Sequence, residues 1–386
     1  QSGYQRSVCR VPCAVSLVSA IESICYDELA LRAYCVAIQF IDENKSSIFA
    51  DRLVGLRMFK GVSMLVGIYG VLFAGCGYVP LDPEHPTARM LAIVRDAGIL
   101  CLVSQITLVL ALPRAKNGRQ QRFLSDRWFS GGKSLSYVLF TSGSTGRAKG
   151  VAIEHHNSCY FVATMMGVET RSKRIRALFM VAYTFDIHTQ NVHQTLTVGG
   201  EIVSLAKWRM LSNLSDILQD HKVGIMQCTP TLLGTASVSF AKHVKVVFAG
   251  GESFPTSLQK QWGYSCVVYD EYGPTEAAVV ATRRCGAGKS SFEGCIGNPV
   301  GGNRCFIKHC DAMSSIGISG ELILGGHQVA RAYLARPRLT ESKFIANQKY
   351  IAANPSLLSY ASGDLCRWLP DGTIAFMGRI DCQVKL

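Results

Sequence analysis

The sequence has 386 residues with a formal net charge of +13; 48 % of the residues are hydrophobic and only 17 % are charged. This balance excludes a disordered or highly charged chain and provides for large cores in two or three domains. The basic residues are scattered and no nucleic-acid-binding motif occurs, so we expect no nucleic-acid partner; a basic surface for an anionic substrate or an acidic partner is the alternative.

The cysteines and the N-terminal region favour a cytoplasmic protein. Fifteen cysteines are spread along the chain, mostly beside apolar residues, and no C-x-x-C pair occurs. This distribution is typical of buried, reduced thiols rather than of disulfides or a metal site. The chain does not open with a charged segment followed by an apolar core, so we expect no signal peptide.

An uncharged run near the N-terminus requires a choice between a membrane span and a core helix. Residues 25–40 show apolar periodicity and predict a helix, and residues 53–58 predict a strand. Residues 61–81 carry no charge, which meets the length criterion for a membrane span, but five glycines and Pro80 interrupt them. We therefore predict a buried helix over 63–73, a glycine turn, a short strand over 78–81, and no membrane partner.

The remaining elements predict an α/β protein. A helix over 89–97 and a strand over 100–104 precede an exposed loop and a buried strand at 135–140. Helical and strand patterns then alternate, which implies largely parallel, helix-covered sheets whose ligands gather at the carboxyl ends of strands. From about Gly297, glycines and short apolar runs predict a smaller antiparallel, barrel-like unit. The expected division is a double-sheet α/β core over 1–296, the small β unit over 297–380 and a hinge over 381–386.

One decapeptide has the composition of a phosphate-binding loop. Thr141-Ser-Gly-Ser-Thr-Gly-Arg-Ala-Lys-Gly150 combines hydroxyls, two cations and three glycines, and glycine lets the backbone approach a ligand closely. It is not a Walker A loop, because Ala148 and Gly150 flank the lysine where that motif needs Gly and Ser or Thr. A flexible surface loop is the alternative interpretation of a Gly/Ser-rich stretch.

This loop and six further stretches resemble, in the same order, the motifs of adenylate-forming enzymes, especially the adenylation domains of nonribosomal peptide synthetases. The seven stretches, which lie between about residue 25 and the end of the chain, are 72–82, 141–150, 185–186, 269–276, 320–334, 362–365 and 378–385. The sequence departs from the family at Ala148, usually Pro, and at Asp270, usually Asn. The resemblance implies the large N-terminal core of the adenylate-forming fold, without the small C-terminal domain that carries a lysine for the transition state, so we expect poor adenylate formation.

The resemblance implies that the chain binds ATP and Mg²⁺. It places Tyr272 against the adenine, Glu276 on Mg²⁺, and Asp364 on the ribose hydroxyls; Asp270 would keep the acceptor of the usual Asn and lose its donor. The implied catalytic residues are Thr141, Ser142, Lys149, Glu276 and Arg379. The implied nucleotide-binding residues are Thr141, Ser142, Gly143, Ser144, Thr145, Gly146, Lys149, Gly251, Glu252, Asp270, Tyr272, Gly273, Thr275, Asp364 and Arg379.

The amino-acid pocket follows from the same resemblance. Asp186 corresponds to the aspartate that pairs with a substrate α-ammonium group; an Asp that merely caps the next turn is the alternative. The other implied pocket residues are Ile187, Gln190, Gln227, Phe248, Gly250, Glu271, Val279 and Val280. Buried Gln and Glu side chains are costly without a partner, and Gly250 leaves room. We therefore predict a long polar substrate side chain: an ornithine-like or hydroxamate-bearing one, as siderophore synthetases use, or lysine or glutamine.

The predicted reaction joins an amino acid to ATP to give aminoacyl-AMP and pyrophosphate. The acceptor would be the phosphopantetheine thiol of a peptidyl carrier domain, with condensation domains of the same synthetase as further partners. An acyl- or aryl-CoA synthetase of the same fold is the first alternative, against which Asp186 argues. A non-catalytic nucleotide-binding relative is the second, and Ala148, Asp270 and Ala361-Ser362 keep it open.

Overall fold

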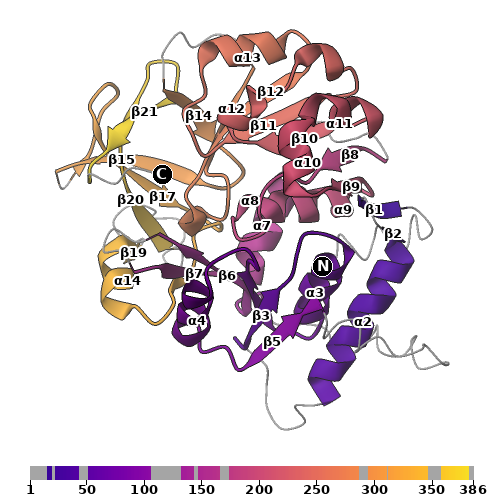
Figure 1. Ribbon diagram of the computed structural model, residues 1–386. Helices are drawn as coiled ribbons and strands as arrows, with labels where there is room; N and C mark the ends of the chain where they lie inside the picture. Colours follow the sequence, from indigo (N-terminus) through magenta and orange to yellow (C-terminus); the bar gives the residue numbers. More distant parts are fainter. Residues whose placement is uncertain are drawn as a thin grey trace.

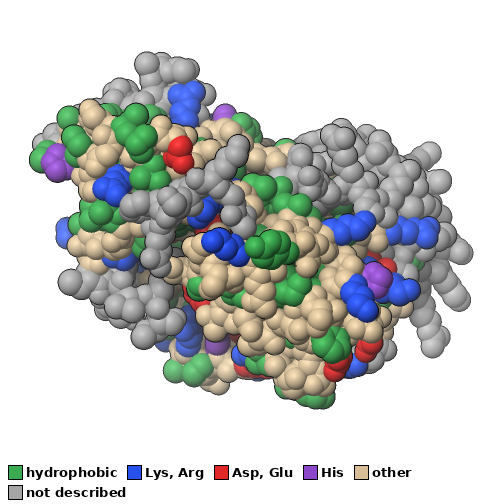
Figure 2. All heavy atoms as spheres, turned by 90° about the horizontal axis from the view of Figure 1, so that it is seen from above, with side chains coloured by type: hydrophobic (Ala, Val, Ile, Leu, Met, Phe, Trp, Pro, Cys, Tyr) green, Lys and Arg blue, Asp and Glu red, His purple; other side chains and the backbone are tan. Residues whose placement is uncertain are grey.

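The computed structural model describes residues 15–19, 22–42, 51–105, 132–142, 147–165, 174–286, 294–310, 312–346 and 358–381. Their strands form one sheet of six strands and one of fifteen. In Figure 1 the indigo and purple elements of the smaller sheet lie below the magenta α/β part of the larger sheet, and the orange and yellow strands lie to the left. No helix within these ranges is long and apolar enough to cross a membrane. On the face in Figure 2, Lys and Arg side chains stand in small separate groups rather than in one patch.

The six-stranded sheet carries the predicted phosphate loop between two of its strands. Its order is β18-β7-β6-β4-β3-β5, with β3–β6 parallel where they pair and β7 and β18 antiparallel to their neighbours. Thr141 at the end of β6 lies opposite Lys149 at the start of β7. The strand bounds are β3 Leu53–Arg57, β4 Gly77–Leu81, β5 Cys101–Ser104, β6 Leu135–Thr141, β7 Lys149–Glu154 and β18 Ala332–Tyr333.

The uncharged run forms a core helix, as predicted. Helix α3 spans Val62–Phe73, and every residue of it except Ser63 is buried. It packs on α2 (Tyr26–Asp42) through Gly70, where a Cβ atom would lie only 2.6 Å from Val36 Cγ1. Close packing on a second helix explains why the run is apolar on all sides without crossing a membrane.

The α/β half of the larger sheet is parallel from β1 through β12. Its strands are β1 Val15–Ser19, β9 Glu201–Ser204, β8 Arg176–Leu178, β10 Ile225–Cys228, β11 Val246–Gly250 and β12 Val267–Tyr272, with β2 Ser23–Cys25 antiparallel at the edge. Gln227, Phe248 and Tyr269 lie side by side in register on one face. The other face packs its apolar side chains with Trp262.

The helices outside α2 and α3 are short. They are α4 Thr87–Asp96, α7 His155–Met165, α8 Ile187–Thr189, α9 Thr195–Thr197, α10 Lys207–Ser212, α11 Leu214–Asp220, α12 Pro230–Leu233, α13 Thr256–Gly263 and α14 Pro337–Lys343. A π-helix, η1 (Gln190–Gln194), joins α8 to α9, and two 3-10 helices are η2 Val238–Phe240 and η3 Thr275–Ala277. Alternation of these helices with parallel strands confirms the predicted α/β class.

The C-terminal strands are antiparallel, as expected, but those that the structure describes form no closed barrel. Strand β14 pairs with β13 on one side and with β21 on the other, so the antiparallel strands continue the α/β sheet. Short β patterns do not specify closure, because closure depends on which distant strands pair. The division at 296/297 stays a prediction. The strands are β13 Thr282–Cys285, β14 Cys295–Pro299, β15 Arg304–His309, β16 Ala312–Met313, β17 Gly320–Gly325, β19 Phe344–Ala346, β20 Leu358–Trp368 and β21 Ile374–Arg379.

A buried tyrosine fixes the two sheets relative to each other next to the Phe-Asp motif. The Tyr183 hydroxyl is 2.8 Å from the Leu81 carbonyl, to which it donates, and accepts from the Met58 amide at 3.0 Å. These partners lie at the carboxyl ends of β4 and β3, while Tyr183 precedes Phe185 and Asp186 by two and three residues. The motif is therefore held at the junction of the sheets.

Replacing Gly250 by Ala tests the close approach of β11 to β12. A Cβ atom on Gly250 would lie 2.3 Å from the Glu271 carbonyl oxygen, so we expect Gly250→Ala to lower the free energy of unfolding by about 1–3 kcal/mol. Gly234→Ala is the matched control, because its Cβ would meet its nearest neighbour, the Thr231 carbonyl, at 3.4 Å. Denaturant unfolding measures both; equal stability of the two variants would contradict the contact.

Candidate active site

A buried ion pair joins the phosphate-loop hairpin to the larger sheet. Lys149 Nζ lies 2.8 Å from Glu276 Oε1, and the Tyr333 hydroxyl donates to the same oxygen at 2.7 Å. Tyr360 extends the cluster at 3.2 Å from the Tyr333 hydroxyl. Burial favours the neutral acid, but the charge and hydrogen bond of Lys149 outweigh it and hold the pKa of Glu276 below its usual value. Glu276 is therefore an ionised, hard oxygen donor.

The hydroxyl of Thr141 completes this end of the hairpin. Its Oγ1 atom is buried without a hydrogen-bond partner, and its backbone pairs with that of Lys149. Ser142 is exposed beside it. The implied residues Gly143, Ser144, Thr145 and Gly146 lie outside the described residues. An oxygen-rich ligand is the partner that the buried hydroxyl and the lysine favour together.

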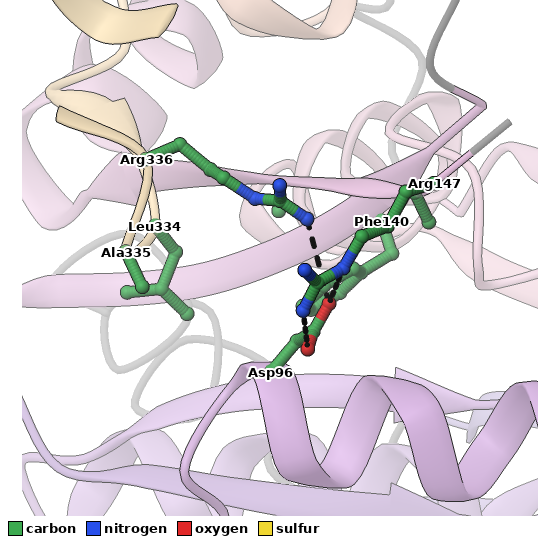
Figure 3. Close-up of a pocket in the computed structure, with 8 residues that line it drawn as sticks. Asp96, Phe140, Arg147, Leu334, Ala335 and Arg336 are labelled. Carbon is green, nitrogen blue, oxygen red and sulfur yellow. Dashed lines mark hydrogen bonds and ion pairs between the residues drawn. The ribbon is translucent and has the colours of Figure 1, made fainter. Parts of the chain in front are cut away.

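Arg147, two residues before β7, is tied to α4 by a two-point ion pair (Figure 3). Its Nη2 and Nε atoms lie 2.6 Å and 3.2 Å from the two carboxylate oxygens of Asp96, the last residue of α4. Arg336 points toward the same carboxylate from the segment after β18, with Nη2 3.7 Å from Oδ2. Hydrogen bonding by Arg147 lowers the pKa of Asp96. The three side chains line a cavity of about 100 Å³ that also contacts Gly150.

The residues implied for the nucleoside form a connected chain. Tyr272, at the end of β12, donates its hydroxyl to Asp364 of β20, and Arg379 of β21 donates to the other Asp364 oxygen at 2.9 Å. Arg379 also forms two 2.7 Å hydrogen bonds with Asp381. Burial raises the pKa of Tyr272, and the Asp364 charge adds to the rise, so the phenol stays neutral. The structure thus brings an aromatic ring, a carboxylate and a guanidinium together.

Asp270 points away from the neighbouring Glu271, because successive residues of a strand face opposite sides. It lies on the α13 side, where Gln259 Nε2 approaches it at 3.4 Å. Burial raises its pKa to about 7, with Glu271 adding to the rise and Arg284 opposing it. The sequence interpretation treated this Asp as an acceptor only, but near neutral pH a large fraction is protonated and keeps an O–H donor.

A second buried ion pair lies on the opposite face of β12. Arg283 of β13 forms an ion pair with Glu271, with Nε 2.9 Å from Oε1, and Gln190 of η1 donates to both carboxylate oxygens at 3.2–3.3 Å. The guanidinium also lies 5.3 Å and 5.0 Å from the ring centroids of Phe248 and Tyr269, which stack on each other. Five polar and aromatic side chains from four elements therefore share one face.

Apolar residues of the implied pocket also meet. Val279 and Val280 are buried in a cluster against which Ile187 packs. Val279 has φ +81° and the preceding Ala278 has φ +47°, a conformation that is strained for a β-branched residue and is found most often at functional sites. Asp186 precedes α8, yet its side chain makes no capping hydrogen bond there. The capping alternative for Asp186 therefore has no support in the structure.

Two implied residues have other structural roles. Glu252 accepts hydrogen bonds from the Thr231 amide and hydroxyl at 3.2 Å and 2.5 Å, so its contacts go to the first turn of α12. The missing side chain of Gly250 was expected to leave room for a substrate, but the backbone of Glu271 occupies that space. Gly250 is required by strand packing.

The sequence interpretation missed Tyr333 and Arg283. Tyr333 lies within the 320–334 motif, but nothing local distinguishes its hydroxyl from that of a core tyrosine. Arg283 follows Val280 by three residues and faces Glu271 only because β12 and β13 pair antiparallel in that register. Its neighbours in the chain, Thr282 and Arg284, are also polar, so no local pattern distinguishes it.

These features define an α/β protein with separate clusters of buried polar side chains around the end of β12. Its sequence matches the profile of the family described as "AMP-binding enzyme" over residues 4–334, and the chain belongs to this family of adenylate-forming ligases. Among curated proteins it is 32 % identical over 408 residues to gramicidin S synthase 2 of Brevibacillus brevis, covering 100 % of this chain and 9 % of that protein. Gramicidin S synthase 1 of the same organism is 29 % identical over 401 residues, covering 99 % and 36 %.

The structural comparison gives the same fold. The nonribosomal peptide synthetase FmoA3 superposes with a TM-score of 0.84 at 22 % identity, covering 98 % of this chain and 42 % of that one. A second structure of FmoA3, in an AMPPNP-bound form, matches equally well. This chain thus has the fold of a peptide-synthetase adenylation domain and spans from 9 % to 42 % of the length of these three proteins.

Removing one partner of the Lys149–Glu276 pair tests its burial. Lys149→Met leaves a buried carboxylate without its cation, and we expect it to lower the free energy of unfolding by about 3–5 kcal/mol. The double variant Lys149→Met/Glu276→Gln removes both charges and is expected to recover most of that loss. Denaturant unfolding of the three proteins measures the effect; a single variant as stable as the wild type would contradict a buried pair.

The raised pKa of Asp270 predicts a pH-dependent stability. Between its ordinary pKa of 3.8 and about 7, the unfolded chain loses a proton that the folded chain keeps, so stability falls as pH rises through this range. Asp270→Asn removes this fall in stability. The melting temperature of the variant should therefore exceed that of the wild type by more at about pH 8 than at about pH 5. A constant difference between the two would show that Asp270 does not titrate there.

Proposed function

We propose that this chain carries the site at which an α-amino acid is activated with ATP, forming aminoacyl-AMP and pyrophosphate. The observation that carries the proposal is the placement of three residue groups around the end of β12: Lys149–Glu276–Tyr333, Tyr272–Asp364–Arg379 and Gln190–Glu271–Arg283. They provide, in turn, charge for a triphosphate, a ring and hydrogen-bonding groups for a nucleoside, and a buried polar pocket for a side chain.

The chain's own residues favour positioning and charge neutralisation as the mechanism. Lys149, freed from Glu276 by a triphosphate, would stabilise the departing pyrophosphate, while Thr141 donates its unpartnered hydroxyl. Arg379 adds positive charge beside Asp364, the carboxylate proposed to bind the ribose hydroxyls. The substrate carboxylate is then held near the α-phosphate, which makes the attack effectively intramolecular.

Glu276 is the residue that would hold Mg²⁺. It is buried and ionised, and among the described residues no group of three or more His, Cys, Asp or Glu forms a metal cage. One carboxylate together with substrate phosphates suits Mg²⁺, which seldom uses an all-protein cage. When bound, the ion supplies additional neutralisation of phosphate charge.

The substrate and partners follow from the pocket and from the relatives. We propose that Asp186 pairs with the α-ammonium group and that the side-chain pocket takes a long polar group, such as that of a modified ornithine, lysine or glutamine. The relatives named above are peptide synthetases, which supports a phosphopantetheine-bearing carrier domain as acceptor and condensation domains as further partners. Use in siderophore synthesis is a proposal that rests on the substrate alone.

Buried free thiols such as Cys228 and Cys305 fit the reducing cytoplasm.

Amino-acid-dependent exchange of pyrophosphate into ATP tests the reaction. The assay uses the full-length protein with a panel of amino acids and matched acids that lack the α-amino group. Asp186→Ala should lower exchange about hundredfold or more, because the substrate ammonium loses its counter-charge. Asp216→Ala, which removes an exposed carboxylate on α11, is the matched control and should leave exchange unchanged.

Two results would contradict the proposal. Exchange only with acids that lack the amino group would identify an acyl-CoA synthetase of the same fold. Binding of ATP without exchange for any acid would identify a non-catalytic relative.

A further inference from the structure

Among the residues implied for the amino-acid side chain is a carboxylate whose charge is already neutralised within the protein. The side chains of Glu271 and Arg283 are only 3 % and 8 % exposed, and they form an ion pair with each other. Burial raises the pKa of Glu271, and the Arg283 charge opposes that rise. Because the guanidinium also lies over the stacked Phe248 and Tyr269 rings, it is held in place from two directions. A cationic substrate side chain would have to displace it.

Two buried amide atoms among the residues implied for the side chain remain without partners. Gln190 donates a hydrogen bond from Nε2 to Glu271. The Oε1 atom of Gln190 is then an acceptor without a partner. Gln227 lies on the same sheet face, two strands from Glu271, and its Nε2 atom is an unpaired donor. Both side chains are 1 % exposed. Buried polar atoms without partners are costly, so a ligand that pairs with both is strongly favoured over one that pairs with neither.

We propose that the pocket selects an amino acid whose side chain ends in a neutral amide-type group, and that Arg283 determines this selection by neutralising Glu271. A carboxamide or a hydroxamate has an acceptor for Gln227 Nε2 and a donor for Gln190 Oε1. Lysine and ornithine carry donors only and bring a positive charge next to Arg283, while glutamate brings an uncompensated negative charge next to Glu271. This inference rests on the proposed function and narrows its substrate class.

Substitution of Arg283 provides the test, again by ATP–pyrophosphate exchange in the full-length protein. The panel is glutamine, asparagine, an N-hydroxy-N-acyl-ornithine, lysine, ornithine and glutamate. For the wild type we expect kcat/KM for the best amide-type substrate to exceed that for lysine and ornithine by about tenfold or more. A higher kcat/KM for glutamine or asparagine than for the acylated ornithine would indicate a carboxamide pocket. The reverse order would indicate a hydroxamate pocket.

Arg283→Met frees the Glu271 carboxylate, so the preference should move toward lysine and ornithine by about tenfold or more. Arg283→Lys keeps a cation and should keep the wild-type preference. Arg304→Met, on an exposed position of β15, is the matched control and should also keep it. If Arg283→Met does not fold, Glu271→Gln/Arg283→Met removes both charges without leaving one unpaired, and it should fold and still prefer neutral side chains.

The outcomes separate this inference from the function on which it rests. Exchange by the wild type that favours lysine, ornithine or glutamate would overturn the inference and leave amino-acid activation standing. The same holds for an unchanged preference in a folded Arg283→Met variant. Absence of exchange with every acid would overturn the proposed function itself.

Discussion

The ion pair between Lys149 and Glu276 is the interaction on which the arrangement of the site depends. Lys149 belongs to the six-stranded sheet and Glu276 follows the last parallel strand of the larger one, so the pair connects the two sheets. Tyr333 and Tyr360 repeat the connection, since the first lies in the smaller sheet and the second in the larger. A buried carboxylate is stable only with such partners. Their contacts with Glu276 hold the phosphate-loop hairpin against the residues implied for the nucleoside.

Strand β12 presents two different sets of side chains on its two faces. Asp270 and Tyr272 point to one side, and Tyr269 and Glu271 point to the other, because side chains alternate along a strand. The first pair belongs to the residues implied for the nucleotide, and the second pair lies with Arg283 on the face that carries the residues implied for the amino acid. The proposed positions of the two ligands are therefore on opposite faces of one strand.

Tight backbone packing fixes this geometry. Cβ atoms on Gly250 and Gly273 would lie 2.3 Å and 2.2 Å from carbonyl oxygens of Glu271 and Val279. Val279 in turn adopts a positive φ, and Gln328, which is fully buried, donates to the carbonyls on either side of it at 3.4 Å. Strain of this kind persists only where the surroundings hold it, and here they hold the backbone at Val279 in place.

The sequence by itself determined the α/β class, a core helix predicted over 63–73, the strand before the phosphate loop, and the family, because periodicity and ordered motifs are local properties of the chain. It also implied roles for Tyr272, Glu276, Asp364 and Arg379, and these roles stay predictions. Only the tertiary structure decided that the β unit does not close, that Glu271 is neutralised by Arg283, and that Tyr333 completes the Lys149–Glu276 pair. Strand pairing and burial create those relations between distant residues, and no local pattern records which side chains will meet.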